Sequence, residues 1–100
     1  FAGLPVQQVD GKRELEVGYG LDPDYWGKGL AAEAACAARD HAFEVLGVDR
    51  LISIIKKENL PSVKVAQRMG MSLEKETLFY DAPVQIWTIS RERWESRLTP

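Results

Sequence analysis

The sequence predicts a single α/β (α+β) domain in which helices pack on a mixed, twisted sheet. Residues 14–21 alternate apolar side chains with polar or small ones, at the period of two that is typical of a strand. Residues 29–46 then place alanine and leucine at helical spacing, and a short Ile-rich run follows at Arg50–Ile55. A strand, a helix and a second strand in this order predict a right-handed crossover between two parallel strands.

The elements on either side of this unit are also predicted from local patterns. Asp10-Gly11 is a turn signal between residues 5–9 and the strand 14–21, and Asp22-Pro23-Asp24 ends that strand. The first helix ends at Gly47, which is typical of the C′ position. We expect its inner face to be the apolar stripe and its charged residues to lie elsewhere; the stripe consists of Leu30, Ala31, Ala34, Ala35, Ala38, Ala42, Val45 and Leu46, and the charged set of Glu33, Arg39, Asp40 and Glu44.

The second half predicts a helix, a hairpin and a short terminal helix. A helix begins near Pro61 and ends at Gly70, with an inner face of Val63, Ala66 and Met69. Strands at 72–80 and 84–90 flank a turn at Asp81-Ala82-Pro83, and the two strands are expected to be antiparallel. Residues 91–98 are expected to form a short terminal helix.

Composition and charge exclude several classes of protein. The chain has 100 residues with 13 basic and 15 acidic side chains and a net charge of −2, which argues against binding to nucleic acid or to anionic membranes. No apolar run approaches the ~20 residues of a membrane span. Cys36 is the only cysteine, so no internal disulfide forms, which fits a cytoplasmic location.

Two glycines stand immediately before the first helix, in Gly27-Lys28-Gly29. Glycines leave the first N–H groups of a helix accessible, and these groups carry the partial positive charge of the helix dipole. Such a helix start binds anions, above all phosphate. The segment has neither the Gly-Lys-Ser/Thr end of a Walker A loop nor the third glycine of a dinucleotide fingerprint.

The order of these motifs resembles the GNAT superfamily of acyl-CoA N-acyltransferases, and most closely its branch that acetylates the N-termini of ribosomal proteins. Four pieces match in order, namely EVGYGLDPDYWGKGLAAEA, AFEVLGVDRLISII, NLPSVKVAQRMGM and QIWTISRERW. Trp26 departs from the usual Arg or Gln of the superfamily, and Met71 from the usual Phe. The first strands and the first two helices of the family have no counterpart, so residues 1–100 read as one partial GNAT domain and as the later part of a longer protein.

The resemblance implies an N-acetyltransferase that binds acetyl-CoA where two neighbouring parallel strands, here 14–21 and Arg50–Ile55, splay apart. It places the pantetheine arm against the backbone of Tyr19, Gly20 and Leu21, which suits the small side of the strand at Gly18 and Gly20. It assigns the remaining cofactor contacts to the loop residues Trp26, Gly27, Lys28, Gly29, Leu30 and Ala31, and to Asn59, Ser62 and Lys64. The plain alternatives are that Asn59 is a helix cap and Lys64 a solvated lysine.

The implied reaction is direct attack of a primary amine, from a protein N-terminus or a small molecule, on the thioester. Glu16 is the candidate base, acting directly or through a water. The alternative interpretation is that Glu16 is an ordinary glutamate on the surface of the strand. The tyrosine that protonates the leaving thiolate in many relatives is replaced by Ala66. The remaining candidates for this proton donor are Ser62, a water and the distant Tyr80. An N–H near Leu21 is the candidate oxyanion donor.

Two other classes of function stay open. The chain can be a truncated or degenerate module that binds CoA, or nothing, and works through protein contacts without catalysis. It can also bind a nucleotide. We predict no metal site, because neither Cys36 nor His41 has partners at ligand spacing, and we expect a partner chain, such as a second copy, or further residues of the parent protein along an exposed apolar sheet edge.

Overall fold

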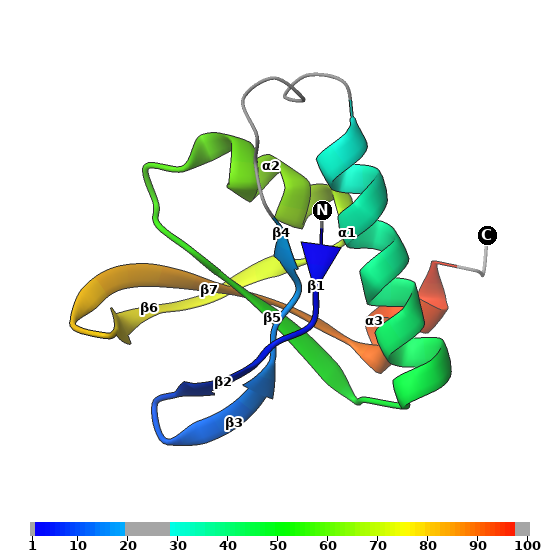
Figure 1. The fold of residues 1–100 in the computed structure, drawn as a ribbon, viewed down its shortest axis with the longest axis horizontal. Coiled ribbons are helices and arrows are strands. Elements are labelled where there is room, and N and C mark those ends of the chain that lie inside the picture. Colours follow the sequence, from blue (N-terminus) through cyan, green and yellow to red (C-terminus); the bar gives the residue numbers. More distant parts are fainter. Residues whose placement is uncertain (1, 20–28, 98–100) are drawn as a thin grey trace.

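The computed structural model describes residues 2–19 and 29–97, and its elements follow the predicted order (Figure 1). The strands are β1 (Ala2–Gly3), β2 (Val6–Val9), β3 (Lys12–Leu15), β4 (Gly18–Tyr19), β5 (Arg50–Ile55), β6 (Ser72–Phe79) and β7 (Ala82–Ser90). The helices are α1 (Leu30–His41), α2 (Leu60–Arg68) and α3 (Arg91–Ser96), and a π-helical segment, Ala42–Leu46, continues α1. No helix among the described residues is long and apolar enough to cross a membrane.

The N-terminal strands form one hairpin whose first arm is interrupted. Gly3 faces Gly18 and Val6 faces Leu15, so a single antiparallel register runs through both ladders. The interruption falls at Pro5, which has no N–H to donate, although its carbonyl still accepts from the Glu16 N–H at 2.9 Å. The turn at Asp10 and Gly11 has positive φ at both residues (48° and 79°), as a two-residue type I′ hairpin requires.

The second sheet has the order β5-β7-β6, and all of its pairs are antiparallel. This confirms the predicted antiparallel pair at the end of the chain. The turn begins one residue earlier and ends two residues earlier than predicted, because it lies at Tyr80 and Asp81, with φ of 49° and 63°. Pro83 is a strand residue opposite Leu78, so β7 begins earlier than the proline suggested.

The predicted parallel contact between strands 14–21 and Arg50–Ile55 is confirmed at one position. Glu16 forms a parallel bridge with Ile52, and the Val17 N–H donates to the Ile52 carbonyl at 2.8 Å.

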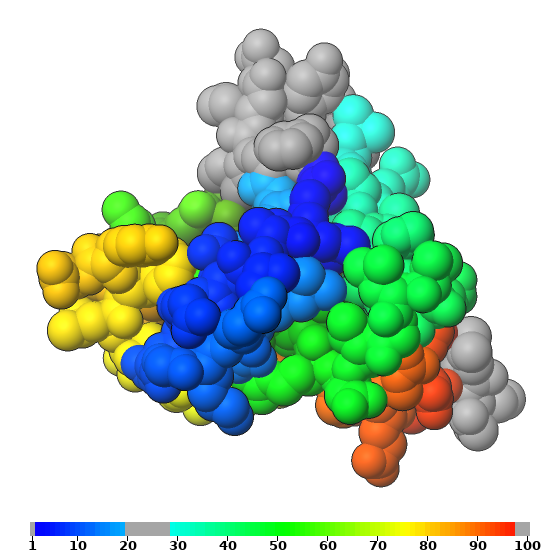
Figure 2. All heavy atoms as spheres, turned by 60° about the horizontal axis from the view of Figure 1, so that its bottom comes forward, coloured from blue at the N-terminus to red at the C-terminus, as the bar shows by residue number. Residues whose placement is uncertain are grey.

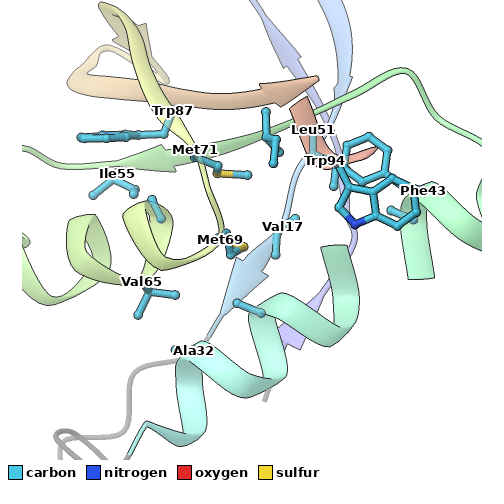
Figure 3. Packing of buried hydrophobic residues seen from close by; sticks show 14 residues of the cluster. Val17, Ala32, Phe43, Leu51, Ile55, Val65, Met69, Met71, Trp87 and Trp94 are labelled. Atoms are coloured by element: carbon cyan, nitrogen blue, oxygen red, sulfur yellow. The ribbon is translucent and has the colours of Figure 1, made fainter. Parts of the chain in front are cut away.

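Helices α1 and α2 contact each other, and the main core lies where they meet the strands (Figure 3). Val17, Leu51 and Met69 are almost fully buried in this core, and Trp94 stacks on Phe43 with ring centroids 5.0 Å apart.

The predicted inner face of the first helix is partly wrong. Leu30, Val45 and Leu46 are exposed, whereas Ala32 and Arg39 are buried. Arg39 is drawn inward because α1 packs against the C-terminal end of α2, where the Arg39 Nη1 donates to the Met69 carbonyl at 2.8 Å. The wider π-helical turn shifts the last residues away from the α-helical spacing on which the prediction rested. On α2, the predicted Ala66 and Met69 are buried, and Val65 joins them.

The N-terminal hairpin curls over the other face of the second sheet, where it lies beside the β6–β7 hairpin (Figure 2). Val9 packs there with Ile52, Val84 and Ile86. The tip of the hairpin is attached to β6, because Asp10 pairs with the Lys75 Nζ at 2.8 Å. The hairpin is thus held to the sheet by this ion pair and by a small second hydrophobic core.

Candidate functional site

The candidate site lies at the edge of β5 that faces β4. On its other edge, β5 pairs with β7 from Arg50 to Ile55 without a break. Backbone groups of alternate residues point to the same edge of a strand, so the N–H and C=O of Ile54 face the same way as those of Ile52, toward β4. After the bridge at Ile52, however, side chains rather than strand backbone provide the contacts described across this edge.

Two side chains satisfy the backbone groups that a continued ladder would have paired. The Ile54 N–H donates to the Glu16 Oε2 at 3.2 Å. The Ser53 hydroxyl donates to the Val17 carbonyl at 2.9 Å. Because a side chain stands between the strands at each of these points, the strands separate at this edge rather than pairing further.

A hollow of about 340 Å³ lies at this separation. Its walls are Glu16 and β4 on one side, the end of β5 with Lys56 on the other, and Asn59 and Ser62 at the start of α2. The structure therefore brings together four residues that the sequence assigned to the site, namely Glu16, Tyr19, Asn59 and Ser62.

Glu16 is half-buried in the wall and held at both carboxylate oxygens. Oε1 accepts from the Gln7 Nε2 at 3.0 Å, and Oε2 accepts from Ile54 as described above. Its partners come from β2 and β5, so the carboxylate position is set by two elements that are distant in sequence. This is more than an ordinary strand-surface glutamate would have.

The side chain of Tyr19 has a structural role that the sequence did not indicate. Its hydroxyl donates to the Ser62 carbonyl at 2.7 Å and so ties β4 to the first turn of α2. Burial raises the pKa of Tyr19 well above its ordinary value, and the nearby Glu16 charge adds to this rise. The only available signal was an aromatic residue on the core-facing side of a glycine-rich strand.

Asn59 is the N-cap of α2, since its Oδ1 accepts from the Ser62 N–H at 3.3 Å. The cap interpretation is thus correct, and the same residue also lines the hollow. Ser62 is 6% exposed and lines the hollow as well. Lys64 is exposed and is not among the lining residues.

Part of the predicted cofactor site lies outside the described residues, namely Gly20 and Leu21, which were expected at the pantetheine arm, and the loop residues Trp26, Gly27 and Lys28. Gly29, Leu30 and Ala31 are described, and Gly29 is the N-cap of α1 with a left-handed φ of 74°. A Cβ on Gly29 would lie 3.9 Å from the Arg68 Nη1. The sequence did not assign Arg68 to the site, because only the packing of α2 on α1 brings it to this helix start.

The remaining candidates do not join the site. Tyr80 is 88% exposed in the β6–β7 turn and Ala66 is fully buried. Cys36 is half-buried, and its Sγ lies 4.0 Å from the Arg68 carbonyl. Within the described residues, no group of three or more His, Cys, Asp or Glu side chains is arranged to hold a metal ion.

Comparison with known proteins points to one family. The profile of a family described as "Acetyltransferase (GNAT) domain" matches residues 2–72. The uncharacterized N-acetyltransferase YnaD of Bacillus subtilis is 36% identical over 64 residues, which cover 64% of this chain and 38% of the relative. The spermidine N(1)-acetyltransferase of Escherichia coli K12 is 40% identical over 58 residues, covering 58% and 31%.

Solved structures agree with this match. A putative GnaT-family acetyltransferase from Bordetella pertussis superposes with a TM-score of 0.76 at 26% identity, over 89% of this chain and 56% of that one. The ribosomal-protein-S5-alanine acetyltransferase from Vibrio fischeri gives a TM-score of 0.72 at 25% identity, over 81% and 48%. The chain spans half or less of the length of the curated relatives named above.

Proposed function

Because the chain belongs to the GNAT acetyltransferase family, we propose that it binds acetyl-CoA and takes part in transferring the acetyl group to a primary amine. The observation that carries this proposal is the open edge between β4 and β5, where a hollow lies beside a fixed carboxylate. An edge of this kind offers backbone groups to a ligand that can itself donate and accept hydrogen bonds.

The residues at this edge fit the pantetheine arm of acetyl-CoA. That arm is long and narrow and carries two amide groups. The alternation of β4 directs the N–H and C=O of Tyr19 toward β5, because those of Val17 point there. The arm would run between these groups and Ile54, with Asn59 and Ser62 at its side, and toward the helix start at Gly29, Leu30 and Ala31. When bound, acetyl-CoA supplies an acetyl group activated as a thioester.

Glu16 is proposed as the base that removes a proton from the attacking ammonium, directly or through a water. An α-amine, with a pKa of about 7.7–8.0, is neutral roughly one time in ten at pH 7, whereas a lysine amine is neutral roughly once in a few thousand. An α-amine therefore needs less help from a base. Ser62, or a water held at it, is the proposed proton donor to the leaving sulfur.

The proposed acceptor is an amine of a small molecule or of a protein N-terminus. One relative is a spermidine acetyltransferase and one structural neighbour is a ribosomal-protein alanine acetyltransferase. Both of these activities modify an amine, which supports this chemical class.

A second candidate is a CoA-binding module without catalysis. The fully buried Ala66 supports it, because the resemblance assigns this position to the tyrosine that protonates the leaving group in many relatives.

Thermal unfolding with and without CoA tests the proposal. A ligand at about 100 times its Kd stabilises the folded state by about 2.7 kcal/mol, so CoA is expected to raise the melting temperature clearly. The matched control is ATP at the same concentration, and a shift with ATP but none with CoA would contradict the proposal. Turnover of acetyl-CoA with a panel of α-amines and polyamines then separates the enzyme from the binding module.

A further inference from the structure

The carboxylate of Glu16 accepts from two neutral donors, and one of them lies outside the strands that form the hollow. The Gln7 Nε2 donates to Oε1 at 3.0 Å, and the Ile54 N–H donates to Oε2 at 3.2 Å. Ile54 lines the hollow, whereas Gln7 lies on β2 and is not among the described lining residues. Gln7 therefore reaches the site through Glu16.

The register of the hairpin alone does not pair Gln7 with Glu16. Glu14 stands directly opposite Gln7 on β3, and Glu16 is the diagonal neighbour two residues further along. Glu14 is already engaged, because its two oxygens accept from the Arg50 guanidinium at 3.1 and 2.7 Å. Pro5, which stands opposite Glu16, has no side-chain donor to offer. The amide of Gln7 thus serves Glu16.

The strand that carries Gln7 is held in place by a buried neighbour. Along β2, Gln7 is half-buried, Gln8 is exposed and Val9 is 3% exposed. Side chains two residues apart share a face of a strand, so Gln7 lies on the same face as Val9. Val9 packs with Ile52 and Val84 in the second core. This packing fixes the position of the Gln7 donor relative to the sheet.

The two donors also decide which way the carboxylate faces. An ionised carboxylate only accepts hydrogen bonds and has about four lone-pair positions. Gln7 and Ile54 occupy one position on each oxygen of Glu16, so other positions stay free to accept a proton. A rotation of the carboxylate would break one or both of these bonds. The free positions therefore keep one direction, and a general base needs such a fixed geometry.

We propose that Gln7 is a positioning residue, whose amide holds the Glu16 carboxylate in the orientation that accepts the proton of the attacking ammonium. In this step an N–H bond of the ammonium breaks, the proton moves to a free position of the carboxylate, directly or through a water, and the neutral amine then attacks the thioester. The inference rests on the proposed role of Glu16 as base. Its structural part, that Gln7 holds the carboxylate against the Ile54 N–H, is measurable without turnover.

Hydrogen exchange of the Ile54 amide, followed by NMR on the full chain, tests the structural part. Gln7→Met keeps a side chain of similar length but removes the donor. A carboxylate released at Oε1 protects the Ile54 N–H less, so this amide should exchange about two- to tenfold faster. The Val17 N–H, which donates to the Ile52 carbonyl, should exchange as in the wild type. The matched control is Gln8→Met on the exposed face of the same strand, which should change neither rate.

Steady-state kinetics with acetyl-CoA and the most active amine of the panel test the functional part. We expect Gln7→Met to lower kcat about tenfold with an unchanged KM for acetyl-CoA, and Gln8→Met to keep the wild-type values. In the Glu16→Gln background, Gln7→Met should lower kcat no further, because a residue that acts through Glu16 then has no base to position. A merely structural role of Gln7 would lower kcat in both backgrounds.

Three results would overturn the inference: unchanged exchange of the Ile54 amide in Gln7→Met, the same acceleration in Gln8→Met, or an equal loss of kcat with and without Glu16. If Gln7→Met fails to fold, Gln7→Thr decides, because its side chain is too short to reach Glu16.

The same measurements separate this inference from the proposed function. If Glu16→Gln leaves kcat unchanged, or the wild type turns over no amine, the proposed base is wrong, and the functional part of the inference is lost with it. If Glu16→Gln lowers kcat but Gln7→Met does not, only the role of Gln7 is wrong.

Discussion

The two edges of β5 are formed by the same six residues, but they differ in how far they pair with a neighbouring strand. Toward β7, every residue from Arg50 to Ile55 has a backbone partner, and the ladder is closed. Toward β4, one bridge at Ile52 is followed by contacts from Glu16 and Ser53 side chains and by a hollow. The closed edge contributes stability, and the open edge leaves backbone groups for a ligand.

The difference shows how a small sheet can hold a binding site without losing its core. Ser53 and Glu16 bond backbone groups at this edge with their own side chains. Among the described residues, no buried side-chain nitrogen or oxygen lacks a hydrogen-bond partner. The cost of an interrupted ladder is thereby kept low.

The largest expected effect is a loss of stability at the closed edge, where β5 pairs with β7. Ile86 of β7 is 1% exposed and faces Ile54, so Ile86→Ala should lower the free energy of unfolding by about 2–5 kcal/mol through lost burial and a cavity. Urea denaturation measures this. Leu78→Ala on the neighbouring strand is the control, because Leu78 is 63% exposed and should cost less than about 1 kcal/mol. Equal costs for the two variants would contradict the described packing.

The next effect is on the chemistry of the open edge. Glu16→Gln keeps the shape of the side chain but removes the proposed base, so kcat/KM should fall about a hundredfold while CoA still raises the melting temperature. Steady-state kinetics across pH measures this. Glu76→Gln, at an exposed position of β6, is the control. An unchanged pH–rate profile in Glu16→Gln would remove Glu16 as the base.

Arg50 tests the ion pairs that link the two sheets. Arg50→Met should cost about 1–2 kcal/mol near neutral pH, because Glu14 and Glu74 lose a shared partner that is only partly buried. The guanidinium holds the pKa of Glu74 below its ordinary 4.5. A carboxylate with a lowered folded-state pKa stabilises the protein above its unfolded pKa and loses this contribution as the pH falls.

The difference in stability between wild type and Arg50→Met should therefore be largest above about pH 5 and shrink below about pH 4. Urea denaturation at a series of pH values measures it. A difference that stays constant from pH 7 to pH 3 would mean that Arg50 acts through packing alone.

The smallest effect is expected at the contact between β4 and α2. Tyr19→Phe removes one hydrogen bond to the Ser62 carbonyl, which should cost about 0.5–1.5 kcal/mol and weaken CoA binding a few-fold. The control is Tyr80→Phe, because Tyr80 is 88% exposed in a turn. If Tyr19→Phe changed neither the stability nor the CoA affinity, the hydrogen bond between β4 and α2 would contribute to neither.

Patterns that depend on neighbours in sequence were predictable. The turn at Asp10 and Gly11, the ends of helices at Gly47 and Gly70 and the Ile-rich strand Arg50–Ile55 all follow from local backbone preferences and periodicity. The failures occur where another element intervenes. Arg39 was expected on the outer face of its helix, but the Met69 carbonyl binds it inside.

The site shows the same division. Glu16, Asn59 and Ser62 were assigned from motifs, and the fold brings them to one hollow. Arg68, Gln7 and the side chain of Tyr19 were not assigned, because their roles depend on contacts with residues 39, 9 and 43 positions away in the chain. No local pattern carries that information.

By itself, the sequence determined the order of the elements, the turn at Asp10 and Gly11, the helix ends at Gly47 and Gly70, and a set of motifs that belong to one family. Those features follow from the backbone preferences of single residues and from periods of two and 3.6. Only the tertiary structure decided which edge of β5 opens, that Arg39 is buried against the end of α2, and how the N-terminal hairpin curls over the sheet. These outcomes depend on hydrogen bonds and burial between distant segments, whose energies exist only once the chain has folded.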